Sequence, residues 1–342
     1  MRVLLTGASG LLGRTTALAL LADGAELTVL QRRPSGLGCR EVLADVSDPA
    51  AVRHAAEGQD AVLHLAAKVD VVGPWAEYER VNVGGTSAVI AACRHHRVPR
   101  LVHVSTPAVA HAGRSLVGAG AGAADPQRAR GHYARSKAMA ETLALQADSA
   151  ELAVLAIRPH LVWGPGDTQL VGPIVERARA GRLPLIGSGA ALIDTTYVDN
   201  AVDALLAAVG VCGEVHGEAL VVSNGEPRPV AEILRRVCRA AGVPGPRGRV
   251  PFAVAHLLGA VIEAGWAVTG RRETPPLNRF LAEQLTTAHW FDQRRTRQAL
   301  RWRPRVSLEE GFTRLAGHYA SPGPGTGGDH DPRASGRTTP GA

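Results

Sequence analysis

Short apolar runs alternate with segments of helical spacing along residues 1–160. The apolar runs, which predict buried strands, lie at residues 2–5, 26–30, 42–44, 61–65, 101–104 and 152–158. The segments that predict helices lie between them, at 15–22, 49–58, 77–82, 83–96 and from about 130 to 148. Strands that alternate with helices in this way are typical of a parallel sheet covered on both faces. The pattern therefore predicts an α/β fold with a doubly wound parallel sheet.

The pattern becomes less regular after residue 165. Helical segments at 171–180, 198–209 and 230–241 alternate with short apolar runs at 183–186 and 219–222. We expect a dinucleotide-binding domain at 1–165, to which some later segments return, and a smaller C-terminal substrate lobe at 166–319. Residues 320–342 are rich in Gly and Pro and have almost no apolar side chain to bury. This composition predicts a disordered tail.

Residues 251–269 form the longest apolar stretch of the chain, interrupted by His256 and Glu263. Two ionisable residues and several Gly and Ala argue against a membrane span. One interpretation is a helix packed on the second lobe. The alternatives are an apolar gate for the substrate or an interfacial helix that makes peripheral contact with a membrane.

The first predicted strand ends in a glycine turn, and a helix follows the turn. Gly7 permits the tight turn, Gly10 lets the backbone approach a pyrophosphate, and Gly13 lets helix and strand pack closely. Phosphates would bind the free N–H groups at the start of the helix, around Ser9, Leu11 and Leu12. Because the glycines stand between a strand and a helix, they predict a Rossmann-type dinucleotide site.

The second strand ends in a sequence that bears on which dinucleotide is bound. Arg32 and Arg33 follow this strand, where an Asp or Glu would bind the ribose hydroxyls of NAD. Arginine suits the additional phosphate of NADP, so the sequence favours NADP(H) over NAD(H). The alternative is that both arginines belong to a solvated loop.

Two later strand ends complete the predicted cofactor site. Asp45, next to Val46, is placed to accept a hydrogen bond from the adenine amine. The segment Ala66-Ala67-Lys68 has small residues that let the backbone approach the cofactor at the carboxyl edge of the sheet.

Composition excludes several classes of function. The chain has 342 residues and a net charge of +7, but it has no basic run with interleaved aromatic residues, so we expect no nucleic-acid partner. The four cysteines have no metal-ligand or CxxC spacing, so no metal site is predicted. Unpaired thiols and a first strand that begins at residue 2 favour a cytoplasmic protein, with membrane association left open.

Tyr133 and Lys137 stand four residues apart on a predicted helix, so both side chains point to one face. A neighbouring ammonium favours the phenolate, and it would bring the tyrosine pKa toward the working range of an acid–base catalyst. Ser105 and Thr106 end the fifth strand, and either hydroxyl could orient a substrate oxygen. Residues 111–125, rich in Gly and Ala, predict a loop long enough to be a mobile flap over the site.

These motifs together resemble the extended short-chain dehydrogenase/reductase superfamily: TGxxGxxG at 6–13, Asp45, Ala66-Ala67, Ser105-Thr106 and the Tyr133/Lys137 pair. The segments at 158–167, 196–200, 279–281 and 289–292 resemble its 3β-hydroxysteroid dehydrogenase-like branch. They are especially similar to the 2-alkyl-3-oxoalkanoate reductases of bacterial olefin biosynthesis.

The resemblance implies NADPH-dependent reduction of a ketone on a long-chain β-keto acid. It also implies Thr106, Tyr133 and Lys137 as the catalytic set, with Pro159 and His160 beside the cofactor. The chain has Ser-Thr-Pro where many relatives have Ser-Ser, so the orienting hydroxyl stays open.

The expected activity is therefore that of an NAD(P)-dependent oxidoreductase acting on a small apolar substrate, a long-chain β-keto acid or a steroid-like ring. A sugar-nucleotide epimerase or dehydratase is the enzymatic alternative, for which Arg177, Arg179 and Arg182 could bind a diphosphate. A non-catalytic dinucleotide sensor is the alternative from another class. A homodimer is expected, although no sequence pattern identifies its interface.

Overall fold

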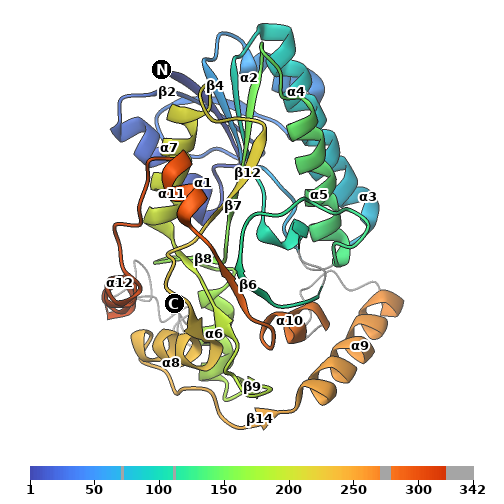
Figure 1. Ribbon diagram of the computed structural model, residues 1–342, viewed down its shortest axis with the longest axis vertical. Helices are drawn as coiled ribbons and strands as arrows, with labels where there is room; N and C mark the ends of the chain where they lie inside the picture. The colour runs from blue at the N-terminus through green and yellow to red at the C-terminus, as the bar shows by residue number, and fades with distance from the viewer. Residues whose placement is uncertain (71–72, 111–112, 270–278, 321–342) are drawn as a thin grey trace, which may run out of the picture.

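The computed structural model describes residues 1–70, 73–110, 113–269 and 279–320. The predicted tail at 320–342 lies outside these ranges apart from its first residue. In Figure 1 a sheet with helices on both sides forms the upper part of the molecule, and further helices with short strands form the lower part.

Seven parallel strands form the main sheet, in the order β12-β7-β5-β4-β1-β2-β3. Its strands are β1 (Arg2–Thr6), β2 (Glu26–Gln31), β3 (Arg40–Leu43), β4 (Ala61–His64), β5 (Arg100–Val104), β7 (Ala153–Pro159) and β12 (Glu218–Val222). The predicted doubly wound α/β fold is therefore confirmed. The last strand comes from the second half of the chain and pairs with β7, Glu218 opposite Leu155.

Two sets of helices cover the two faces of this sheet because each set presents small and branched apolar side chains to it. One face packs on α1 (Leu11–Ala22), α7 (Val198–Val211) and α11 (Arg294–Ala299). The other packs on α2 (Pro49–Ala56), α4 (Gly85–His96) and α5 (Gly131–Gln146).

The two helices predicted at 77–82 and 83–96 form one continuous helical segment. It begins as α3 (Trp75–Tyr78), widens into the π-helical turn η1 (Glu79–Gly84) and continues as α4. The π-helical turn has more residues than an α-helical turn, and it lies beside the loop that follows β4. Such turns are frequent at functional sites.

The second lobe has its own apolar core. Its helices are α6 (Val171–Arg179), α8 (Val230–Ala240) and α12 (Leu308–Ala320). Its short strands are β8 (Val162–Trp163), β9 (Leu185–Ile186), β10 (Leu192–Ile193), β11 (Thr196–Tyr197), β13 (Arg228–Pro229), β14 (Arg249–Val250) and β15 (His289–Phe291). Most of these strands have two residues, too few for a recognisable pattern.

The structure corrects in part the prediction of a loop at 111–125. It contains β6 (Leu116–Ala119), which follows the short helix η2 (Pro107–Ala110) and pairs with β15 of the second lobe. Residues 111–112 lie outside the described part. Backbone hydrogen bonds therefore fix part of the expected flap to the second lobe.

Residues 252–269 form the helix α9, which packs on α10 (Arg279–Gln284) at the lower right of Figure 1. No helix within the described ranges is long and apolar enough to cross a membrane.

Candidate active site

The glycine turn after β1 leaves room that a side chain would fill. A Cβ on Gly7, which has φ +84°, would lie 2.7 Å from the Ala66 nitrogen, and one on Gly13 would lie 2.1 Å from the Gly7 oxygen. A Cβ on Gly10 would meet nothing within 4 Å, so the space above it is open. Gly10 is the N-cap of α1 and provides no side-chain cap for its N–H groups. This turn fits a pyrophosphate.

The other residues of the turn differ in their exposure to solvent. Ser9 is exposed on the turn. Leu11 and Leu12 open α1 and pack against the apolar core of the second lobe.

The predicted adenosine residues lie on neighbouring strand ends. Arg32 and Arg33 are exposed immediately after β2, whose Leu30 oxygen accepts a hydrogen bond from the Gly7 N–H at 3.2 Å. Asp45 accepts hydrogen bonds from the backbone and hydroxyl of Ser47, at 2.9 and 2.7 Å.

Arg80 also approaches the Asp45 carboxylate, at 3.3 Å. Val46 is buried, and its methyl group would meet a Cβ on Gly85 at 2.8 Å. The adenine-binding role of Asp45 and Val46 stays a prediction.

The loop after β4 is held by side chains on its two sides. The Ala66 N–H donates to the Thr6 hydroxyl at 3.1 Å, next to the glycine turn. The Lys68 N–H donates to Asn82 Oδ1 at 2.7 Å, and its ammonium contacts Asp70 and Glu77. Ala67 lies between these two anchors, so the loop backbone is fixed across the cofactor side of the sheet.

The side chains of Thr106 and Tyr133 are neighbours, and the Thr106 hydroxyl favours the phenolate form of Tyr133. Thr106 lies just beyond β5, and Tyr133 lies in the first turn of α5. Burial raises the pKa of Tyr133 to about 12, against the opposing effect of the Thr106 hydroxyl. The sequence predicted a lowered tyrosine pKa; here desolvation outweighs the effect of the Thr106 hydroxyl.

Lys137 is buried one helical turn beyond Tyr133. Its ammonium donates to the Val104 backbone oxygen at 2.6 Å, at the end of the strand that leads to Ser105 and Thr106. Burial lowers the pKa of Lys137 to about 8, and Glu141 acts in the opposite direction. The lysine is therefore a cation that titrates near neutral pH, directed at the backbone that carries the two candidate hydroxyls.

Pro159 and His160 end the neighbouring strand β7. The Ser105 N–H donates to the Ile157 oxygen at 2.7 Å, so the ends of β5 and β7 lie together. The His160 ring packs edge-on against Phe291, with 5.0 Å between ring centroids. The structure thus brings the residues after β1, β4, β5 and β7 to one edge of the sheet.

Three groups of buried polar residues behind this edge were not predicted. Asn82 and Ser136 connect the loop after β4 to α5. His64 and His103 lie on adjacent strands, with ring centroids 5.4 Å apart. Arg158 and Glu141 form an ion pair whose side chains are almost fully buried. Only Glu141 had a sequence signal, because it follows Lys137 by one helical turn.

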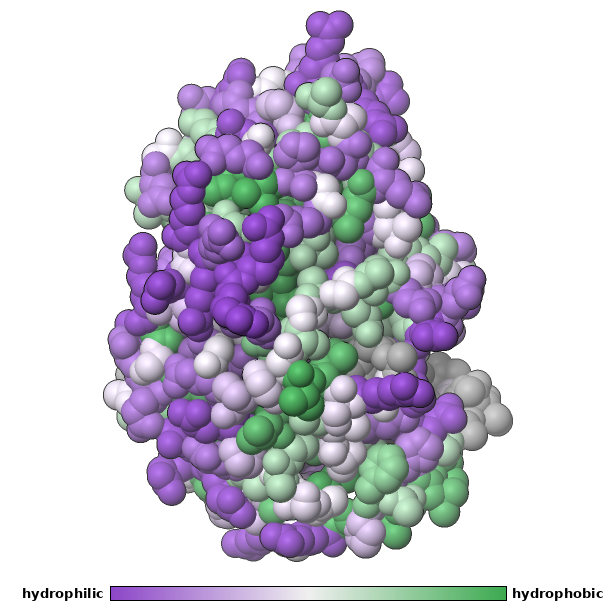
Figure 2. All heavy atoms as spheres, viewed as in Figure 1, coloured by the Kyte–Doolittle hydropathy of each residue, from purple (hydrophilic) through white to green (hydrophobic). Residues whose placement is uncertain are grey.

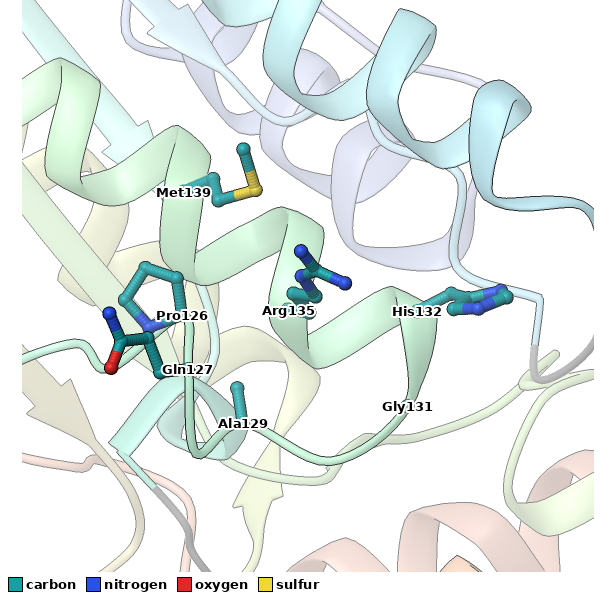
Figure 3. A pocket seen from close by; sticks show the side chains of 7 residues that line it. All are labelled: Pro126, Gln127, Ala129, Gly131, His132, Arg135 and Met139. Atoms are coloured by element: carbon teal, nitrogen blue, oxygen red, sulfur yellow. The ribbon is translucent and has the colours of Figure 1, made fainter.

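Figure 3 shows a hollow between α5 and the loop that precedes it. His132, Arg135 and Met139 line it from the helix, and Pro126, Gln127 and Ala129 line it from the preceding loop. Since neither Tyr133 nor Lys137 is among its lining residues, this hollow is separate from the candidate reacting groups.

Residues 4–252 match the sequence profile of the 3-beta hydroxysteroid dehydrogenase/isomerase family. The chain belongs to this family. It is 41% identical over 333 residues to a 2-alkyl-3-oxoalkanoate reductase of Stenotrophomonas maltophilia (strain K279a), covering 94% of this chain and 100% of that protein.

A 2-alkyl-3-oxoalkanoate reductase of Shewanella oneidensis is 37% identical to this chain over 325 residues. The match covers 91% of this chain and 84% of that protein. These relatives confirm an NAD(P)-dependent oxidoreductase that acts on a ketone or a secondary alcohol.

Among solved structures, the fold is similar to that of DesIV, a dTDP-glucose 4,6-dehydratase from Streptomyces venezuelae. The TM-score is 0.72 with 22% identity, over 93% of this chain and 97% of that one. The similarity supports the extended short-chain dehydrogenase/reductase fold.

Proposed function

We propose that this family member reduces the ketone of a long-chain β-keto acid with NADPH. The observation that carries the proposal is the placement of Thr106, just beyond β5, beside Tyr133 in the first turn of α5, with the Lys137 ammonium 2.6 Å from the Val104 oxygen behind them. The names of the two bacterial relatives support this substrate class.

Each residue of the set has a distinct task in this reaction. Tyr133 is the proton donor, because its raised pKa keeps the phenol protonated, and the proton passes to the substrate oxygen as the carbonyl becomes a hydroxyl. Thr106 holds the substrate oxygen beside the phenol. Lys137 provides positive charge behind both hydroxyls and returns the phenolate to its protonated form. The bound nicotinamide supplies the hydride.

NADPH is favoured because Arg32 and Arg33 are exposed where the adenosine ribose would lie, and guanidinium groups bind phosphate well. The test is fluorescence titration of the purified protein with NADPH and NADH. Replacing both arginines by serine is expected to weaken NADPH binding by about tenfold to a hundredfold, equivalent to one or two charge-assisted hydrogen bonds. NADH binding is expected to change little.

Arg301→Ser is the matched control, since Arg301 is exposed and paired with Glu214 away from the turn. Equal weakening of both cofactors by the double variant would contradict the proposed role of the arginines.

The activity test follows NADPH absorbance after addition of ethyl 3-oxodecanoate, a stable ester of a β-keto acid. We expect NADPH consumption and a 3-hydroxy ester as product. Copurified NAD with no net turnover of either reduced cofactor would instead support the sugar-nucleotide alternative.

We also propose peripheral contact of α9 with an anionic membrane. Val254, Leu257, Leu258 and Val261 form an exposed apolar stripe on this helix, and Leu257 is 66% exposed. Figure 2 shows apolar surface at the lower right, where Figure 1 places α9. Arg247 and Arg249 are exposed just before the helix, and they suit anionic headgroups.

Cosedimentation with vesicles of phosphatidylglycerol and of phosphatidylcholine tests this contact. We expect the anionic vesicles to retain the protein and Leu257→Asp to release it. Equal recovery in the supernatant with both lipids would refute the contact. A cytoplasmic location and a homodimer complete the proposal, and sedimentation equilibrium would test the dimer.

A further inference from the structure

The second lobe contains a partly open apolar cavity of about 60 Å³ between α6, α8 and β10. Trp163 and Phe312 lie on its wall with their rings stacked, 4.6 Å between centroids. The polar groups at the wall are themselves paired, because the Trp163 indole N–H donates to the Thr195 hydroxyl at 3.0 Å. Cavities with apolar walls stay dry, so water does not stabilise this space.

Two residues of the cavity wall connect it to the candidate active site. Leu161 directly follows Pro159 and His160 at the end of β7. Leu285 directly follows α10, and Glu283 of that helix is ion-paired with Arg130, at the start of the helix that carries Tyr133. The cavity wall therefore includes one residue just beyond the end of β7 and one residue just beyond the helix that is ion-paired with Arg130.

Leu161 has a backbone conformation that leucine rarely adopts, with φ +45°. This left-handed conformation costs about 1 kcal/mol or more for a residue with a Cβ. The surrounding structure fixes it, since the Thr196 N–H donates to the Leu161 oxygen at 3.2 Å. Strained residues concentrate at ligand sites. Leu161 does not continue the extended conformation of β7, and its side chain lines the cavity.

We propose that this cavity receives the terminal carbons of an alkyl chain of the substrate while the keto group lies at Tyr133. The inference rests on the proposed ketoreductase function and adds the site that selects chain length. At roughly 15 Å³ of such free volume for a group the size of a water molecule, the cavity holds about four carbons. The rest of the chain extends past Leu161 toward the reacting groups.

The test is kcat/KM for a series of ethyl 3-oxoalkanoates of increasing chain length. We expect kcat/KM to rise by about fourfold for each methylene that becomes buried, until the cavity is full. Ile174→Phe on α6 fills part of the cavity. It is expected to lower kcat/KM for the longest well-used ester by about tenfold and to leave the shortest ester unchanged.

Ile90→Phe is the matched control. Ile90 on α4 is 8% exposed and Ile174 is 9% exposed, but Ile90 packs between the helices of the first domain. The control makes the same change in a core of similar burial, and it is expected to keep the wild-type chain-length profile. A uniform loss for all esters in Ile174→Phe, or the same profile change in Ile90→Phe, would overturn the proposal.

Ile174→Ala gives a second, independent arm because it enlarges the cavity. It is expected to move the preferred chain length up by about two carbons, which replace the side-chain atoms removed. An unchanged preference in this variant would also overturn the proposal.

Calorimetric titration with decanoic acid separates this inference from the proposed function. Binding to the wild type and at least tenfold weaker binding to Ile174→Phe, without reduction of any ester, would support the cavity and refute the reductase. Reduction of the esters with equal binding by both proteins would refute the cavity and leave the reductase standing.

Discussion

The side-chain amide of Asn82 donates a hydrogen bond of 2.8 Å to the hydroxyl of Ser136. The same side chain exchanges hydrogen bonds with the backbone of Lys68, accepting at 2.7 Å and donating at 3.1 Å. Ser136 in turn donates to the Tyr133 carbonyl at 2.9 Å. One buried amide thus connects the loop after β4 to α5, the helix that carries the proposed proton donor.

Asn82→Ala is expected to lower both stability and turnover. It leaves buried partners at Lys68 and Ser136 without their hydrogen bonds, which costs about 2 kcal/mol of unfolding free energy. Because the loop and α5 then move independently, kcat is expected to fall by about tenfold. Urea unfolding and steady-state kinetics measure the two effects.

Asn200→Ala separates these effects. Asn200, in the first turn of α7, is equally buried and donates to the Val306 oxygen at 2.7 Å, in the segment before α12. It should lose similar stability and keep the kcat of the folded enzyme. A loss of kcat in both variants would assign the effect of Asn82 to stability alone.

Tyr133→Phe is expected to lower kcat by about a hundredfold to ten-thousandfold, because it removes the proposed proton donor and little volume. NADPH binding should persist, since the glycine turn is unchanged. Tyr319→Phe on α12 is the control and should retain full activity. Turnover close to that of the wild type in Tyr133→Phe would refute the assigned role.

Acid is expected to destabilise the protein through its buried histidines. Burial, with a smaller effect from the Lys137 charge, lowers the pKa of His64 from 6.5 to about 3, and the same causes lower that of His103. Below pH 6.5 the unfolded chain binds these protons and the folded chain does not. Stability is therefore lost as pH falls from 6.5 toward 3, by about 1.4 kcal/mol per pH unit for each histidine.

His103→Leu tests this dependence. In the described part of the chain neither ring nitrogen of His103 has a hydrogen-bond partner, so the substitution removes a proton-binding group at little other cost. Urea unfolding at several pH values between 7 and 5 should show a shallower slope than the wild type. Equal slopes would refute the contribution of His103.

Glu141→Gln should destabilise the fold by about 3–5 kcal/mol, because it leaves the Arg158 guanidinium buried without its anion. Arg158 also donates to the backbone oxygens of Ala121 and Gly122, so cleavage by a protease near these residues should accelerate. Glu232→Gln, which breaks the more exposed pair with Arg236, should cost at most about 1 kcal/mol. Similar losses in the two variants would contradict the importance of burial.

The sequence predicted the main sheet well because buried parallel strands have a clear pattern. The apolar runs at 61–65 and 101–104 became the adjacent strands β4 and β5, with His64 opposite His103. The short strands of the second lobe were missed because pairs such as Val162–Trp163 and Thr196–Tyr197 have no detectable period. They form through tertiary contacts.

The candidate site was predicted where residue type and spacing indicate chemistry. Thr106, Tyr133 and Lys137 lie together, although their catalytic roles stay predictions. The tyrosine pKa was wrong in direction because desolvation cannot be judged before burial is known. Asn82 and Arg158 were missed because their partners at Ser136 and Ala121 are distant in the chain.

The pairing of β12 with β7 affects how the protein can form on the ribosome. Domains tend to fold as they are synthesised, N-terminal parts first. Here the first six strands of the sheet emerge long before Glu218–Val222, so β7 has an unpaired apolar edge during translation. A nascent chain stalled between these two strands is exposed to edge-to-edge aggregation until its last strand arrives. A protein truncated at residue 165 would lack β12, and the edge of β7 would stay unpaired and open to aggregation.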